Sequence, residues 1–261
     1  MKTEETSSRF AAEKMNHQNN LRASEDMCRF CFDVLVGEIV HERQRGNASV
    51  PTFIDSLPHP AVQCPLFVTW DKRRSTSLLQ RGSSGDSSSN AIFDLRGCIG
   101  TLSPRPLVEA MRELALTSAI QDRRFPPISK HELPFLRVGV SLLVQYEECA
   151  DCFDWYVGTH GIMISFSMSR SGGGVEYSAT YLPEVAFEQG WTQLEAVQSL
   201  IRKAGFVGDI NDDLYVSISC TRYQSSKVKA TYDDFIRLNG GVDPLSDDSS
   251  AKRSGFGRFF S

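Results

Sequence analysis

Between residues 138 and 144, every second position carries an apolar side chain: Val138, Val140, Leu142 and Val144. A period of two is typical of a β-strand, and we expect this strand to lie near the centre of a sheet. Two further apolar segments, 162–168 and 175–181, flank Ser171-Gly172-Gly173-Gly174. This arrangement predicts a β-hairpin.

Helices and shorter strands are interleaved along the rest of the chain. Helical spacing of apolar residues predicts helices that begin at Ser24 and Ser103, the second running over 104–119, and a third over 194–204. Apolar segments also predict strands over 66–70, 92–99 and 214–220. Because hairpins are frequent, we expect an α+β fold in which helices pack on a mixed or antiparallel sheet.

Composition limits the class of protein. The chain has 261 residues and a net charge of −4, so its overall charge offers no electrostatic footprint for nucleic acid. It lacks the roughly 18 consecutive apolar residues that suit a membrane-spanning helix, and its first twenty residues lack the apolar region of a secretory signal. With seven cysteines, an odd number, we expect reduced thiols and a location in the cytoplasm or nucleus.

Three segments have polar compositions typical of chain without a packed core. We expect residues 1–22 and 240–261 to be disordered tails and the Ser-rich residues 71–90 to be a solvated connection. The intervening residues, 23–239, are then the globular domain.

A cysteine between two glycines marks the candidate site, within Leu95-Arg96-Gly97-Cys98-Ile99-Gly100-Thr101. Glycine allows a sharp turn or the close approach of another group, and a guanidinium beside a thiol favours the thiolate. We expect a strand that ends in a turn and presents Arg96 and Cys98.

The same stretch resembles the signature of the AMME chromosomal region candidate gene 1 protein family, or AMMECR-one domain. Other matching segments follow in order, among them Pro65-Leu66-Phe67-Val68-Thr69-Trp70, Asp122-Arg123-Arg124-Phe125-Pro126-Pro127, Gly158-Thr159-His160-Gly161 and Gln189-Gly190-Trp191. The resemblance extends from about residue 23 to about residue 239. It implies an α+β domain of one larger and one smaller subdomain, with the signature near their junction, and it makes 71–90 an insertion. It implies no settled activity or cofactor, but it suggests Memo-like or radical-SAM pathway partners.

Cys98 is the candidate nucleophile or metal-binding thiol, and its alternative role is a small buried side chain. A nucleophile needs a base within hydrogen-bond reach; His160 is the first candidate and His131 the second. Glu184 is a candidate general acid or base, with a helix-start carboxylate as the alternative.

Two arginines, Arg96 and Arg123, are candidates for holding a phosphate or carboxylate through paired hydrogen bonds. The alternative is structural ion pairs, for instance with Asp122 or Glu184. Because the helix over 104–119 leads from the signature to the next motif, we expect Asp122, Arg123 and Phe125 to approach Arg96, Gly97, Cys98 and Gly100 and to complete a ligand-binding site.

Two CxxC pairs, Cys28/Cys31 and Cys149/Cys152, have the ligand types of a four-thiolate zinc site. Since Cys31 falls on the apolar face of the first predicted helix, we expect no metal site. Three functions stay open: an enzyme acting on a small anionic or nucleotide-like substrate, a binding module for such a ligand, or a protein-interaction adaptor that works through its surface and tails.

Overall fold

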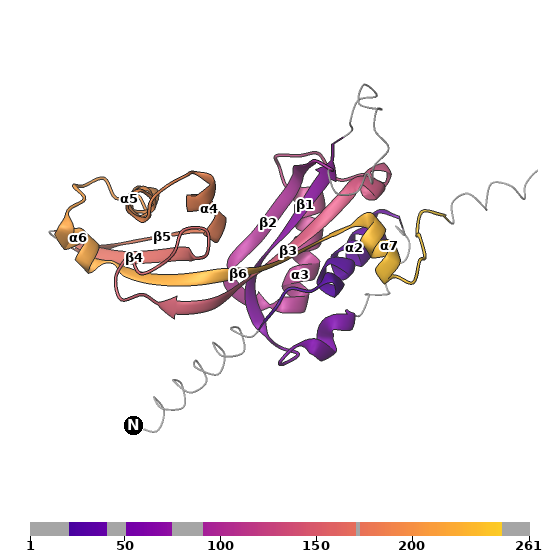
Figure 1. Ribbon diagram of the computed structural model, residues 1–261, viewed down its shortest axis with the longest axis horizontal. Helices are drawn as coiled ribbons and strands as arrows, with labels where there is room; N and C mark the ends of the chain where they lie inside the picture. Colours follow the sequence, from indigo (N-terminus) through magenta and orange to yellow (C-terminus); the bar gives the residue numbers. More distant parts are fainter. Residues whose placement is uncertain (1–20, 41–50, 75–90, 171–172, 247–261) are drawn as a thin grey trace, which may run out of the picture. The chain divides into compact units, whose positions relative to one another are not determined.

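The computed structural model describes residues 21–40, 51–74, 91–170 and 173–246 (Figure 1). Contacts between residues divide the chain into two compact units. Among the described residues, unit 1 takes in those within Val62–Cys64 and Leu142–Ser226 together with 21–22. Unit 2 takes in those within Ala23–Ala61 and Pro65–Ser141 and the residues from Lys227 onward.

Helices and strands alternate along the chain. In order they are α2 (Glu25–Ile39), the 3₁₀ helix η1 (Thr52–Ser56), β1 (Gln63–Arg73), β2 (Phe93–Pro106), α3 (Leu107–Leu116), the π-helical turn η3 (Thr117–Gln121), the 3₁₀ helix η4 (Lys130–Phe135), β3 (Leu136–Glu148), β4 (Gly161–Arg170), β5 (Gly173–Tyr181), α4 (Pro183–Glu188), α5 (Gln193–Lys203), α6 (Asp212–Ser217), β6 (Ser219–Thr231) and α7 (Tyr232–Leu238).

The strands form one six-stranded sheet in the order β2-β1-β3-β6-β4-β5. Strand β4 pairs antiparallel with both β5 and β6. The predicted α+β class, with helices packed on a mixed or antiparallel sheet, is confirmed. The strand predicted around 138–144 is β3, and its place between β1 and β6 confirms that it is an inner strand.

In unit 2, helices α2, α3 and α7 pack on one face of the strands (Figure 1). Strand β1 meets two of them through Trp70, whose indole N–H donates to the Ala115 carbonyl of α3 at 3.0 Å and whose ring lies 5.1 Å from Phe32 of α2. Phe32 also stacks on Phe235 of α7 at 5.2 Å. Buried aromatic side chains therefore join all three helices to the sheet.

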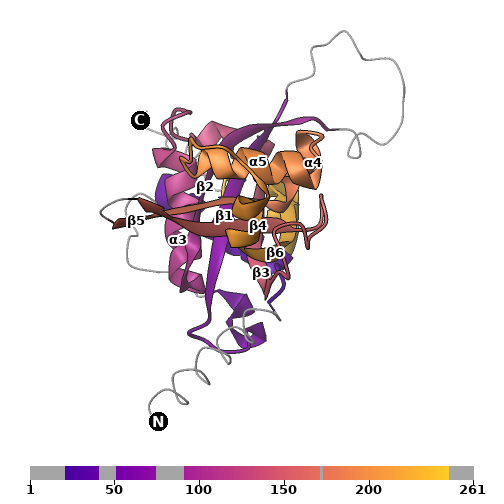
Figure 2. The ribbon, with the colours of Figure 1, turned by 90° about the vertical axis from the view of Figure 1, so that its left-hand side faces the viewer.

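In unit 1, helices α4 and α5 lie on the same side of the β4–β5 hairpin (Figure 2). The apolar face of α5 packs against the inward residues of β4, in a core that includes Ile162, Ile164, Val197 and Leu200. Helix α5 begins at a capping box, in which Thr192 and Glu195 satisfy each other's backbone N–H groups. The helix ends at Lys203, and the chain reverses at Gly205, whose φ is +93°.

Two sequence predictions are wrong in detail. The strand expected over 214–220 is instead the helix α6 followed by the start of β6. The helix begins there because the side-chain oxygen of Asn211 accepts a hydrogen bond from the Leu214 N–H at 3.0 Å. The helix expected from Ser103 begins only at Leu107, because β2 continues to Pro106.

The segments predicted to lack structure fall mostly outside the described residues. Residues 1–20, 75–90 and 247–261 are among those not described. Of the expected insertion, residues 71–73 form the end of β1. Of the expected C-terminal tail, Asp243 accepts a hydrogen bond from the Tyr232 hydroxyl at 2.8 Å.

None of the helices in the described ranges has both the length and the apolar character needed to cross a membrane.

Candidate functional site

The glycine–cysteine motif lies in the middle of strand β2, so the expectation that the strand ends there in a sharp turn is wrong. Neither Gly97 nor Gly100 is among the residues with positive φ. Both glycines instead allow close approach. A methyl group at Gly97 would overlap the carbonyl oxygen of Ser118, and one at Gly100 would overlap the ring of Phe67.

The contact at Gly97 comes from the π-helical turn η3, which directly follows α3. Ser118 is buried, and its hydroxyl donates to the Leu114 carbonyl at 2.6 Å. Single π-helical turns are frequent at functional sites because they redirect the chain that follows. Here the turn places Asp122 beside the backbone of β2.

Asp122 and Arg124 form hydrogen bonds with both backbone polar groups of Cys98. The Cys98 N–H donates to the Asp122 carboxylate at 2.9 Å, and the Arg124 guanidinium donates to the Cys98 carbonyl at 3.0 Å. Arg124 also donates to Asp122, through Nε at 2.9 Å and Nη2 at 2.6 Å. The Arg124 hydrogen bond holds the pKa of the Asp122 carboxyl well below its usual range. Two charged side chains thus pair with one residue of β2, an outermost strand of the sheet.

Cys98 is a half-buried residue, and its sulfur accepts a hydrogen bond from the Thr69 hydroxyl of β1 at 3.2 Å. Burial raises the pKa of the other six cysteine thiols, to about 12 for Cys28 and Cys64. Those six are therefore poor nucleophiles.

Arg96 is engaged in a structural ion pair. Its guanidinium donates to both carboxylate oxygens of Glu132, at 2.9 and 3.1 Å, and to the Pro127 carbonyl at 3.3 Å. Only 8% of its surface is exposed. This matches the structural alternative to anion binding, although the partner is Glu132 rather than Asp122 or Glu184.

Glu132 links three segments of unit 2 through hydrogen bonds. It accepts hydrogen bonds from Arg96, from Lys72 at 2.9 Å, and from the Ser129 N–H at 3.0 Å, which caps η4. Burial alone would raise the pKa of the Glu132 carboxyl, but the hydrogen bonds from Arg96, Ser129 and Lys72 together lower it to about 2.

Arg123 and Arg124 have different surroundings. Arg123 is exposed, and no hydrogen bond or ion pair joins it to another residue in the described part of the chain. Arg124, which follows it, is the residue that pairs with Asp122. Phe125 lies beside Arg124, whose guanidinium is 5.5 Å from the ring centre. Asp122 and Arg124 therefore contact the motif directly, and Arg123 and Phe125 adjoin them in sequence.

His160 and Glu184 lie in unit 1, whereas Cys98 lies in unit 2. His160 is buried, and its Nδ1 accepts a hydrogen bond from the Tyr156 N–H at 3.0 Å. Burial, followed by the positive charge of Arg222, lowers the pKa of His160. Glu184 is in the first turn of α4. His131, the second candidate base, is exposed on η4 in unit 2.

The two CxxC pairs also fall in different units. The Cys28 thiol donates to backbone carbonyls of Val138 and Val228, each at 3.7 Å, as expected for a small core residue. Among the residues with described positions, no group of three or more His, Cys, Asp or Glu is arranged to hold a metal ion.

Sequence reasoning missed Thr69, Arg124 and Glu132. The structural role of Glu132 could have been predicted, because Ser129 and Glu132 have the spacing of a capping box. The roles of Thr69 and Arg124 could not, since they depend on which strand lies beside β2 and on the turn that η3 makes.

The fold and the motif define an α+β protein with a cysteine between two closely packed glycines on an outermost strand. The model of the AMMECR1 family matches residues 28–228, and the chain belongs to this family. The resemblance read from the sequence is thereby confirmed.

Related proteins from distant organisms cover most of the chain. An uncharacterized protein of Arabidopsis thaliana is 41% identical over 214 residues, which is 82% of this chain and 88% of that protein. An uncharacterized protein of Schizosaccharomyces pombe is 36% identical over 211 residues, which is 81% of this chain and 94% of that protein. A crystal structure of an uncharacterized protein from Pyrococcus horikoshii is similar, with 26% identity, a TM-score of 0.48, and coverage of 78% of this chain and 91% of that one. These relatives assign no activity.

Proposed function

We propose that the face of unit 2 around Cys98 binds a small anionic ligand, with the thiol in contact with the ligand and Arg123 supplying positive charge. The observation that carries the proposal is the environment of Cys98, a half-buried residue. Its sulfur accepts a hydrogen bond from Thr69 while Asp122 and Arg124 pair with its backbone. The side chain is thus held in place without being fully buried in the core, as contact with a ligand requires.

Charge favours an anion over a cation at this place. Arg124 already donates hydrogen bonds to Asp122 and to the Cys98 carbonyl. Arg123 is exposed and makes no ion pair with any described residue, so its charge is available to a ligand. Guanidinium groups suit phosphate and carboxylate because their donors match the paired oxygens of those groups.

Binding is favoured over nucleophilic catalysis. The one hydrogen-bond partner of the Cys98 sulfur among the described residues is a hydroxyl, which is not a base at neutral pH. The candidate base His160 and the candidate acid Glu184 both lie in the other unit. A catalytic version of the site would need a base within hydrogen-bond reach of the sulfur.

Charged and neutral alkylating reagents test the proposal. Iodoacetate is a small anion and iodoacetamide its neutral counterpart, so their rate ratio at Cys98 measures local anion recognition. We expect this ratio in the folded protein to exceed the ratio in the urea-unfolded chain. Arg123→Gln should lower the ratio, by about threefold for a charge that acts on the reagent across roughly 6 Å of water-like surroundings, which corresponds to about 0.7 kcal/mol.

Arg105→Gln is the matched control. Arg105 is also on β2, seven residues from Cys98, which is about 23 Å along the strand and beyond the screening length of physiological salt. Its substitution should leave the ratio unchanged. Equal ratios in folded and unfolded chains, or equal effects of Arg123→Gln and Arg105→Gln, would refute anion recognition at Cys98.

A second measurement separates binding from chemistry. If binding alone is the function, Cys98→Ala keeps the thermal stabilisation that inorganic pyrophosphate gives the protein at matched ionic strength, and Arg123→Gln loses it. Loss in Cys98→Ala with retention in Arg123→Gln would assign the function to the thiol and overturn the role given to the arginine.

A further inference from the structure

Unit 1 contains a pocket of about 530 Å³ beside helix α5. This volume lies within the range of small-ligand sites. Its lining includes Trp191, Glu195, Gln198, Arg202, Asp209 and Ile210. Glu195, Gln198 and Arg202 recur at steps of three and four residues, so they share one side of α5, and Trp191 lies just before the helix begins. We call this feature the α5 groove.

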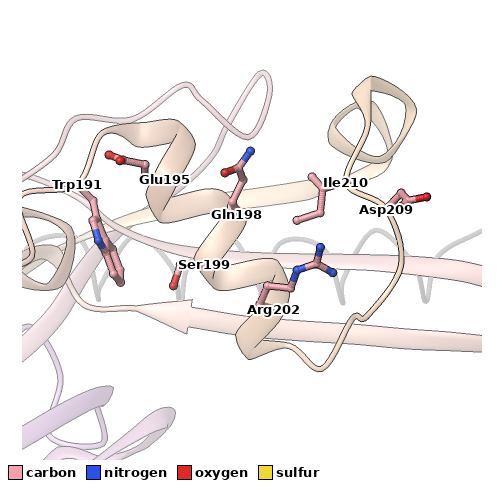
Figure 3. Close-up of a pocket in the computed structure, with 7 residues that line it drawn as sticks. All are labelled: Trp191, Glu195, Gln198, Ser199, Arg202, Asp209 and Ile210. Carbon is pink, nitrogen blue, oxygen red and sulfur yellow. The ribbon is translucent and has the colours of Figure 1, made fainter.

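The α5 groove has two chemically different ends (Figure 3). Trp191 and Glu195 lie at one end, and Arg202, Asp209 and Ile210 lie at the other. Helix α5 has 11 residues, which corresponds to about 16 Å. A peptide of about five extended residues spans that length. The groove is therefore longer than a single amino-acid side chain.

At the first end, Glu195 is fixed in place with one oxygen still available. Its Oε2 accepts hydrogen bonds from the Thr192 N–H at 2.8 Å and the Thr192 hydroxyl at 2.9 Å. No described residue donates to Oε1. A carboxylate held in this way can receive a cation without first losing side-chain freedom.

Trp191 lies beside an aromatic ring that already binds a cation. The Tyr181 ring is 5.8 Å from Trp191, and the ammonium group of Lys203 lies 4.5 Å from the Tyr181 ring centre. Within the described ranges, no lysine or arginine lies over Trp191 itself. Indole is the aromatic ring that attracts cations most strongly, and here it adjoins a carboxylate.

At the second end, Arg202 is held by two backbone carbonyls. Its Nη1 donates to Phe206 at 3.0 Å and to Gly208 at 2.7 Å. Its Nη2 has no partner among the described residues and can donate to a further oxygen. Arg202 itself cannot donate to a purely cationic ligand, whereas a peptide backbone offers carbonyl acceptors.

We propose that the α5 groove binds an extended peptide through one basic side chain, arginine or lysine, placed over Trp191 beside Glu195. Arg202 donates to a backbone carbonyl of the same peptide. The acidic and aromatic end supplies the preference for a basic residue, and the opposite end sets the direction in which the peptide lies.

Tryptophan fluorescence gives a direct test. The chain has three tryptophans, of which Trp70 and Trp155 are 0% and 2% exposed, whereas Trp191 is half-buried. Acrylamide quenching therefore reports mainly on Trp191. We expect a capped five-residue peptide with a central arginine to protect it from quenching in a saturable manner. The same peptide with citrulline, the neutral isostere of arginine, should not protect it.

Glu195→Gln is the decisive variant, because glutamine preserves the capping box while removing the charge. This substitution should lower the affinity for the arginine peptide about fivefold. Glu188→Gln, an exposed carboxylate of α4 outside the groove, should have no effect. Should Glu195→Gln alter folding, the comparison of the arginine and citrulline peptides on the parent protein still tests the charge requirement, because it removes the charge from the peptide instead of from the groove.

Three results would overturn the proposal: equal protection by the citrulline peptide, stronger protection by spermidine than by the arginine peptide, or unchanged affinity in Glu195→Gln. The second would identify a polyamine site instead. The proposal concerns unit 1 alone and does not depend on anion binding at Cys98.

Discussion

Replacing Gly97 by alanine should destabilise the protein strongly. The added methyl carbon would overlap the Ser118 carbonyl oxygen and lie 3.1 Å from the Ser118 carbonyl carbon. Both obstacles are backbone atoms of the π-helical turn, so no side-chain rotation relieves them. Strand β2 and the turn must instead separate by on the order of 1 Å.

The cost has two parts. Overpacking of this kind costs about 1–3 kcal/mol. The separation also strains the hydrogen bond from Cys98 to Asp122, which contributes about 1 kcal/mol or more because the acceptor is charged. Together they predict that Gly97→Ala lowers the free energy of unfolding by about 2–4 kcal/mol.

Gly37→Ala in helix α2 is the matched control, since no atom lies within 4 Å of the new methyl group. The two substitutions change the unfolded chain alike, and alanine favours a helix by about 0.5–1 kcal/mol. Urea unfolding followed by circular dichroism should therefore show a lower free energy of unfolding for Gly97→Ala and a higher one for Gly37→Ala. Ordinary surface substitutions change the free energy of unfolding by up to about 0.5 kcal/mol. A Gly97→Ala protein that differs from the parent by no more than this would refute the close-packing explanation of the motif glycines.

Two further predictions concern Glu132 and Gly205. Glu132→Gln should cost about 3 kcal/mol at pH 7, because it leaves the buried Arg96 guanidinium without its counter-charge. The folded-state pKa of Glu132, about 2 against an ordinary 4.5, means that its stabilisation is present above pH 4.5 and is lost as the pH falls towards 2. Urea titrations across that window should give a shallower pH dependence in Glu132→Gln, and an unchanged slope would contradict the ion-pair assignment. Gly205→Ala should lower stability by about 1 kcal/mol through backbone strain alone, since φ is +93° and no atom lies within 4 Å; a melting temperature equal to or above that of the parent would count against this.

Much of the architecture could be predicted from the sequence. The alternation at Val138–Val144 predicted the inner strand β3, and the glycines after residue 170 predicted the β4–β5 hairpin. The same kind of alternation misled at 214–217, where Asn211 caps a helix. A period of two over four or five residues does not distinguish a strand from one turn of helix, and the capping hydrogen bond decided between them.

The site divides in the same way. A cysteine between two glycines is a local and unusual combination, so the motif around Gly97, Cys98 and Gly100 could be recognised from the sequence, and the predicted approach of Asp122 to it is seen in the structure. The pairing of Arg96 with Glu132, the hydrogen bond from Thr69 to the Cys98 sulfur and the place of His160 in the other unit follow from the fold and could not be predicted. The physical reason is that periodicity and composition report which side chains are buried. The partner of each is fixed by the order and register of strands far apart in the chain, which no local pattern records.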